Sequence, residues 1–377
     1  MASVWFASGQ GRGASSRYVG FRAGRRRATS ATSTLLARPL ARPRKDPVDR
    51  RPSIRDVARE AGVSTALASF ALNDQKGVSA ASRARILEAA EKLGYRADPV
   101  ARALRTGDGN AYGVMIRNMA NPFFLDVLRG AQEAATRQGA TILAVDSEYS
   151  VEREREHIDL LVAQRVRGLA IAPVGSGEGV ARWLELCPGR STVVINALRP
   201  TNARVTRVSP DNERAVTLAV DHLVELGHRR ISFLTAPAGL VADDDRKRCF
   251  LRRCMERGVE PDLVETHLSL ERVHSAVTAR LRSTQPPTAI ITNSDFTAHA
   301  VYRAARDCGV LVGKDLSVVG HDDLPSSQLL DPPLTTLRLD RLSIGKAVFA
   351  RLADPEGLGD HVEPVELIQR RSTGRVG

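Results

Sequence analysis

The segment at residues 62–73, GVSTALASFALN, sets Ser, Thr and Asn among small apolar residues. Hydroxyl and amide side chains can hydrogen-bond to DNA phosphates and base edges, and small residues let a helix lie deep in the major groove. The same stretch would also suit an ordinary core helix. The elements on either side must therefore decide between a DNA-reading helix and a core helix.

Helix signals surround this segment. Ser53 can cap a first helix that ends near residues 61–62. Ser64 can cap a second helix that runs to about Leu72, and a third helix follows a loop and ends at Gly94. The interval between the first two helices fits the turn of about three to four residues in a helix-turn-helix. The sequence therefore predicts a small all-α unit of the helix-turn-helix type.

Positive charge is concentrated at the front of the chain. The formal net charge is +12, residues 1–50 hold eleven basic and two acidic residues, and residues 111–377 carry no net charge. This asymmetry predicts that only the front meets a polyanion. The Arg- and Ser-rich residues 1–50 superficially resemble an organelle transit peptide, and we interpret them as a disordered basic extension. The alternative is a tail that adds non-specific attraction to DNA.

After residue 110 the hydrophobic pattern of the sequence changes. Apolar β-rich runs (YGVMI, ATILAV, GLAIAP, TVVIN) alternate with amphipathic helical stretches, and the pattern begins again with RISFL, TAIIT and LSVVG. Such alternation indicates parallel sheets covered by helices, so we expect an α/β core of two doubly wound parallel-sheet lobes. Ligands in open parallel sheets bind beyond the carboxyl ends of the strands, so the residues just after each run are the candidates.

Several other classes of protein are not expected. No apolar run approaches the ~20 residues of a membrane span, and the N-terminal segment has no secretory h-region. The four cysteines form no CxxC pair and no metal-ligand spacing, which predicts free thiols in a reducing cytosol and no metal or cofactor. GxSxG and P-loop motifs are absent, so we expect no enzyme and no catalytic residues.

In this order of elements the chain resembles the LacI/GalR (lactose-repressor) family of bacterial transcription regulators. The motifs that carry the resemblance are SIRDVAREAGVS, LEAAEKLGYRADPVARALRTG, NPFF, DHLVELGHRRI, GHDD, DPPLTT and RRST. The resemblance implies a DNA-binding head at residues 51–97, a hinge helix and linker at 98–110, and a two-lobed effector-binding and dimerisation domain at 111–377. Residues 1–50 lie outside it.

The resemblance implies a cytoplasmic homodimeric repressor that binds near-palindromic, double-stranded operator DNA and has no membrane segment. A small effector, a sugar or a derivative, would bind between the lobes and control operator affinity, which couples two sites through two global states. The alternative is a solute-binding protein without DNA readout. It would need an export signal and no DNA head, and the sequence shows the reverse on both counts.

By the resemblance, the DNA bases are read by Thr65, Ala66 and Phe70. Better-known members carry a polar residue in place of Leu67 and often Arg in place of Phe70. Arg reads guanine bidentately and Phe cannot, so Phe70 is expected to pack on a thymine methyl or a sugar. The residues assigned to DNA in the head are Ser53, Ser64, Thr65, Ala66, Leu67, Ser69, Phe70 and Asn73.

The hinge follows the same logic. Leu104 matches the family's apolar wedge, which kinks the duplex at a central base step, whereas the alternative is a linker residue packed on the lobes. Ala101 would allow close approach, and Arg102 and Arg105 would lie near phosphates.

The effector residues implied by the resemblance are Phe123, Phe124, Asn196, Arg246, Ser294, Asp295 and Asp322. Carboxylates, amides and a guanidinium can pair with vicinal hydroxyls while an aromatic face covers ring C–H groups, which is consistent with a polyol. Asn196 stands where many members carry Asp, and Ser294 where many carry Asn. As alternatives, the Phe pair would be core, the two Asp residues helix caps, and Arg246 a surface ion-pair residue.

Overall fold

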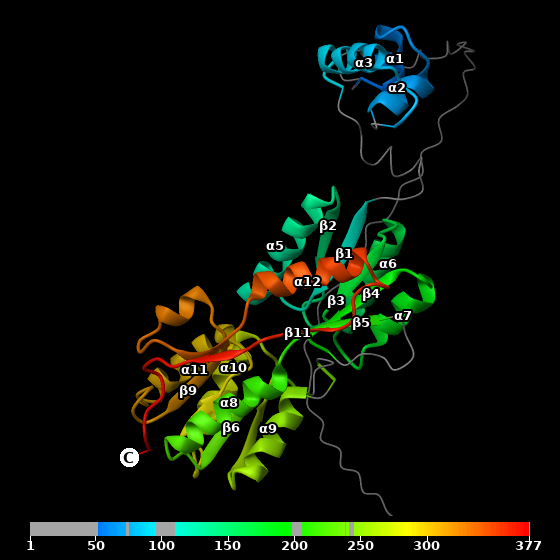
Figure 1. Cartoon of the computed structure of the whole chain (residues 1–377). Helices are drawn as coiled ribbons and strands as arrows, with labels where there is room; N and C mark the ends of the chain where they lie inside the picture. The colour runs from blue at the N-terminus through cyan, green and yellow to red at the C-terminus, as the bar shows by residue number, and fades with distance from the viewer. Residues whose placement is uncertain are drawn as a thin grey trace, which may run out of the picture.

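The computed structural model describes residues 52–72, 75–95, 110–197, 205–237, 239–240 and 245–376. The described residues form a three-helix head and two lobes, each built on a six-stranded sheet (Figure 1). Within these ranges no helix is long and apolar enough to cross a membrane. The predicted extension at residues 1–50, Asn73, and the hinge residues Ala101, Arg102, Leu104 and Arg105 lie outside the described residues.

The head consists of α1 (Ile54–Glu60), α2 (Thr65–Leu72) and α3 (Ala80–Lys92). The backbone N–H and the hydroxyl of Ser53 both donate to Asp56 Oδ2, at 2.9 and 2.6 Å, and Ser64 Oγ accepts the backbone N–H of Leu67 at 3.2 Å. These contacts satisfy groups that a helix start leaves unpaired. The core of the head consists of Val57, Ala58, Ala61, Ala68, Ala71, Ile86, Ala89 and Ala90. The predicted helix-turn-helix is confirmed.

Lobe 1 is the first doubly wound unit. Its sheet has the order β11-β5-β4-β3-β1-β2 with every neighbouring pair parallel. Its elements are β1 (Ala111–Ile116), α5 (Pro122–Arg137), β2 (Thr141–Asp146), α6 (Val151–Ala163), β3 (Gly168–Ile171), α7 (Glu178–Leu186), β4 (Ser191–Ile195), β5 (Val205–Pro210), α12 (Arg341–Ala353) and β11 (His361–Glu363).

Lobe 2 repeats the arrangement. Its sheet has the order β12-β10-β9-β8-β6-β7, and only the β10–β12 pair is antiparallel. Its elements are α8 (Asn212–Glu225), β6 (Arg230–Thr235), α9 (Asp245–Glu256), β7 (Glu260–Glu265), α10 (Leu270–Leu281), β8 (Ala289–Ile291), α11 (Asp295–Asp307), β9 (Ser317–Asp322), the 3₁₀ helix η2 (Pro325–Gln328), β10 (Thr335–Arg338) and β12 (Glu366–Ile368). The predicted pair of α/β lobes is confirmed.

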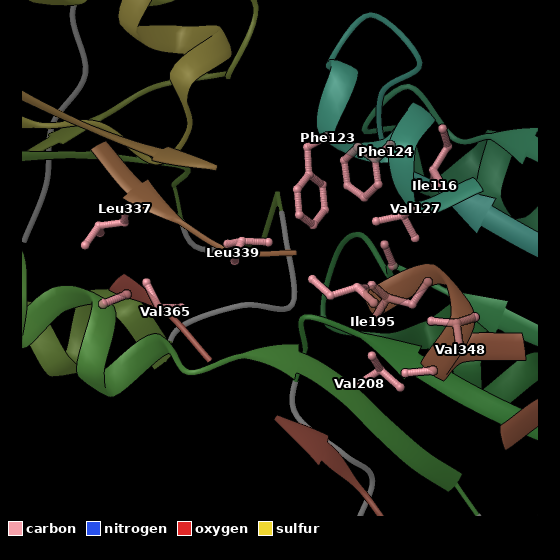
Figure 2. Packing of buried hydrophobic residues seen from close by; sticks show 14 of the residues in the cluster. Ile116, Phe123, Phe124, Val127, Ile195, Val208, Leu337, Leu339, Val348 and Val365 are labelled. Carbon is pink, nitrogen blue, oxygen red and sulfur yellow. The ribbon is translucent and has the colours of Figure 1, made fainter. Parts of the chain in front are cut away.

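The chain passes between the lobes three times, at Asp211, at residues 339–340 and at residues 364–365. Figure 2 shows Leu339 and Val365 on the last two of these segments, while Val127 and Val348 lie in lobe 1. Three short connections of this kind are typical of hinged two-domain proteins.

Helices α5 and α12 pack together at unusually close range. A Cβ atom on Gly130 would lie 2.2 Å from the Leu342 carbonyl oxygen, and one on Gly345 would lie 2.0 Å from the Val127 carbonyl oxygen. Only glycine allows two helix backbones to approach this closely. The packing fixes the first turn of α5, which carries Phe123 and Phe124 (Figure 2).

Candidate functional site

A polar cavity lies between the lobes at the carboxyl ends of the strands, where open parallel sheets bind their ligands. Lobe 1 contributes residues after β1, β2 and β4, the end of β5, and the N-cap and first turn of α5. Lobe 2 contributes the residues after β6, β7 and β8, the end of β9 and the start of α9. The residues that line the cavity are Arg117, Asn121, Phe123, Phe124, Tyr149, Asn196, Pro210, Thr235, Ala236, Arg246, Leu268, Asn293, Ser294, His321 and Asp322. Six of the seven predicted effector residues are among them.

Asp322 is the carboxyl group of this cavity. It ends β9 with a φ of 114°, a conformation that costs about 1–3 kcal/mol for a residue other than glycine. Its Oδ1 pairs with Nδ1 of His321 at 2.9 Å, and its buried Oδ2 has no hydrogen-bond partner among the described residues. Burial raises the pKa of Asp322 to about 8, against the influence of Arg246 and Arg341. Asp322 therefore presents an oxygen that a ligand hydroxyl can engage.

Two guanidinium groups face the cavity from opposite lobes. Arg246, at the start of α9, donates from Nη1 to the Asn293 carbonyl oxygen at 2.7 Å. Arg117, directly after β1, is 6% exposed and donates from Nη2 to the Asn196 carbonyl oxygen at 3.1 Å. The sequence analysis missed Arg117, although its position just after an apolar run met the rule that was applied to the other candidates.

Tyr149 was also missed. It follows β2 with a φ of 59° and stands edge-on to His267 of lobe 2, with ring centroids 5.2 Å apart. Burial raises the pKa of its hydroxyl, and the guanidiniums of Arg117 and Arg246 oppose that rise. The guanidiniums of Arg117 and Arg246 therefore both lower the pKa of this hydroxyl.

The remaining predicted residues combine packing with exposure to the cavity. Phe123 and Phe124 are both buried, stand edge to face with centroids 5.1 Å apart, and belong to the core as well as to the lining. Asn196 has a φ of 47°, and its Oδ1 accepts a hydrogen bond from Asn212 Nδ2 at 3.0 Å. Ser294 caps α11 by accepting the Thr297 N–H at 3.3 Å.

Asp295 was predicted to line the cleft, and the structure places it elsewhere. Its fully buried carboxylate accepts the Leu324 N–H at 2.8 Å and the hydroxyls of Ser327 and Thr336 at 2.5 and 2.6 Å. Burial and the neighbouring Asp322 raise its pKa to about 7. Asp295 thus fixes the loop after β9, and its oxygens are occupied by these protein donors rather than directed into the cavity.

The start and the exposed side of α2 carry four of the eight head residues assigned to DNA. Ser64, Thr65, Ala66 and Phe70 are exposed, whereas Ala68 and Ala71 are buried in the core of the head. Ser69 and Leu67 are half-buried, and Leu67 packs against that core. The hydroxyl of Ser53 is engaged in the cap of α1.

Comparisons with known proteins match both parts of the chain. Residues 53–98 match the model of the bacterial regulatory proteins of the lacI family, and residues 220–373 match a periplasmic binding protein-like domain. The chain is 30% identical over 333 residues to the HTH-type transcriptional repressor CytR of Escherichia coli strain K12, covering 85% of this chain and 96% of that protein. It is 29% identical over 322 residues to the repressor PurR of Aliivibrio fischeri strain MJ11, covering 84% and 95%.

Among solved structures, a lac repressor dimer bound to operator and the anti-inducer ONPF matches with a TM-score of 0.77 and 26% identity, covering 86% of this chain and 100% of that one. A helix-turn-helix head joined to a two-lobed core with a polar cleft defines a DNA-binding transcriptional regulator with an effector-binding domain. The chain belongs to the LacI family of bacterial regulatory proteins.

Proposed function

We propose that the protein is a cytoplasmic homodimeric repressor whose α2 helices read two half-sites of a near-palindromic operator. The observation that carries this proposal is the exposed face of α2, where Thr65, Ala66 and Phe70 stand clear of the core of the head. Helices of this kind place their N-terminal side chains against base edges in the major groove. Ser64 and Ser69 would position the helix on phosphates, and the hinge residues Ala101, Leu104 and Arg105 would enter the minor groove.

The cleft would bind a small hydroxyl-bearing effector without transforming it. Asp322 and Arg246 would hold the hydroxyls, Asn196 and Ser294 would contribute further hydrogen bonds, and Phe123 or Phe124 would cover an apolar ring face. The lac repressor structure similar to this chain holds the anti-inducer ONPF together with operator.

Binding in the cleft would require the lobes to move. The free volume of the cleft is about 60 Å³, whereas small-molecule sites enclose roughly 300 Å³ or more. The contacts that join the lobes beside it include the Tyr149 and His267 rings, the hydrogen bond from Asn212 to Asn196, and an ion pair of 2.5 Å between Arg207 on β5 and Asp245 on α9. An effector that binds one lobe arrangement better than the other shifts the equilibrium between them, which would change the spacing of the two heads.

The test is selection of fragmented genomic DNA by the purified full-length protein at near-physiological salt, followed by sequencing. We expect enrichment of a short near-palindrome with a dyad spacing of about one helical turn. The matched control is the Phe70→Ala variant, which should lose that enrichment. Retention that depends only on salt, with no shared motif in the retained fragments, would contradict the proposal.

A further inference from the structure

The lining of the cleft carries more positive than negative charge. Of its residues, Arg117 and Arg246 are guanidinium cations, and Asp322 is the single carboxyl group. Burial raises the pKa of Asp322 to about 8, which reduces its negative charge near neutral pH. A second buried guanidinium has a high desolvation cost, and a neutral polyol offers no negative charge to offset that cost.

The two guanidiniums line the same cavity from opposite lobes. Both act on the buried hydroxyl of Tyr149, one from the end of β1 in lobe 1 and the other from α9 in lobe 2. Arg246 also opposes the raised pKa of Asp322, so its guanidinium influences both the phenol and the carboxyl of this cavity. An acidic group beside Tyr149 could therefore receive donors from both lobes at once, in the planar fork geometry that suits carboxylates and phosphates.

Helix dipoles add potential of the same sign. Asn121 caps α5 and Ser294 caps α11, and both residues line the cavity, so two helix N-termini point at it. Helix N-termini favour anions.

Two carboxyl groups lie behind this wall and do not line it. Asp146 accepts backbone N–H groups from Met119 and Glu148 at 2.7 and 2.9 Å. Glu154 accepts the Val174 N–H at 2.8 Å, and burial raises its pKa to about 7. Both carboxyl groups are engaged by backbone donors, and neither lines the cavity, although Arg117 opposes the raised pKa of Glu154.

We propose that the effector carries an acidic group, a carboxylate or a phosphate, in addition to hydroxyls. Arg117 and Arg246 clamp the acidic group beside Tyr149, and Asp322 receives a hydroxyl. This inference rests on the proposed function, because it names the chemical class of the molecule that the same cleft binds. Arg117 then determines specificity for an acidic effector over its neutral counterpart.

The first arm of the test uses inorganic phosphate as the probe for the acidic group. Thermal unfolding of the full chain is followed while phosphate replaces chloride at constant ionic strength. We expect a saturable rise in Tm that is lost in Arg117→Met and in Arg246→Met and is kept in Arg306→Met, a control on the exposed face of α11. Arg117→Lys retains the charge and should keep part of the rise, which separates loss of the anion site from loss of folding.

The second arm compares matched pairs by calorimetry: ribose with ribose 5-phosphate, and glucose with gluconate and glucose 6-phosphate. We expect an acidic member to bind at least tenfold more tightly than its neutral partner, with the difference removed by Arg117→Met. The pair that binds distinguishes carboxylate from phosphate.

The proposal is overturned if phosphate gives no saturable shift, if the shift persists in both arginine variants, or if a neutral sugar binds as tightly as its acidic counterpart. Operator selection is measured on the same preparation. A recovered palindrome together with any of these outcomes refutes only the acidic effector, whereas phosphate binding without a palindrome refutes the proposed repressor.

Discussion

Replacing Phe70 by Ala should weaken specific DNA binding and leave the fold of the head intact. Phe70 is 44% exposed and is not among the described residues that pack against the core of the head. A phenylalanine covers roughly 150–250 Å² when buried, so about 90 Å² of its surface is available to contact DNA. At about 25 cal/mol per Å², that surface is worth about 2 kcal/mol at each half-site, or roughly a thirtyfold change in affinity.

The assay is fluorescence anisotropy at fixed, near-physiological salt, with the selected operator and with a scrambled duplex of equal length. Phe70→Ala should lose affinity for the operator and retain its weak affinity for the scrambled duplex, because phosphate contacts are unchanged. The control is Met255→Ala, which also removes an exposed apolar side chain, but from α9, which is remote from the head in sequence. This variant should bind both duplexes as the unmodified protein does. Unaltered operator affinity, or an equal loss on both duplexes, would refute the assignment of Phe70 to base readout.

Three further perturbations test the core. Gly130→Ala should lower the free energy of unfolding by about 1–3 kcal/mol in urea titrations, because its Cβ would meet the Leu342 carbonyl oxygen. In an open helix the same replacement would stabilise the protein by about 1 kcal/mol. A stabilised variant would show that α5 and α12 can separate without cost. Burial raises the folded-state pKa of Asp322 from its usual value of 3.8 to about 8, so its contribution to stability is full below about pH 4 and is lost as the pH rises towards 8. Asp322→Asn should therefore flatten the fall in Tm measured between pH 5 and 9, and an unchanged slope would contradict the raised pKa. Arg341 donates to Asp126 Oδ2 at 2.8 Å and to the Asp323 carbonyl oxygen at 3.1 Å, which links α5 to lobe 2. A double-mutant cycle of Arg341→Met with Asp126→Asn should therefore give a coupling free energy of unfolding of about 1–3 kcal/mol. Strictly additive effects of the two substitutions would mean that the Arg341–Asp126 pair contributes no stability.

The architecture could be predicted from the sequence because its signals are local. Alternating apolar runs and amphipathic stretches report burial at the periods of strand and helix, and capping residues such as Ser53 and Ser64 mark helix starts through contacts within one turn. The position of the cleft followed as well, since the carboxyl ends of parallel strands share one edge of a sheet. On α2, Thr65, Ala66 and Phe70 are exposed, whereas Leu67, also assigned to DNA, packs against the core of the head.

The sequence alone could not decide which polar residue after a strand faces the cleft. Asp295 and Asp322 both follow apolar runs, yet only Asp322 lines the cavity, because its left-handed backbone turns it there. Asp295 instead occupies the space above Gly320, where a Cβ would lie 2.0 Å from Asp295 Oδ1. Arg117 and Tyr149 follow β1 and β2 in lobe 1, and they line the cavity because lobe 2 lies opposite the ends of these strands. The sequence by itself determined the elements and the family, since these depend on neighbours along the chain. Tertiary packing decided the composition and the charge of the site, because its walls come from segments that are distant in sequence and meet only across the two lobes.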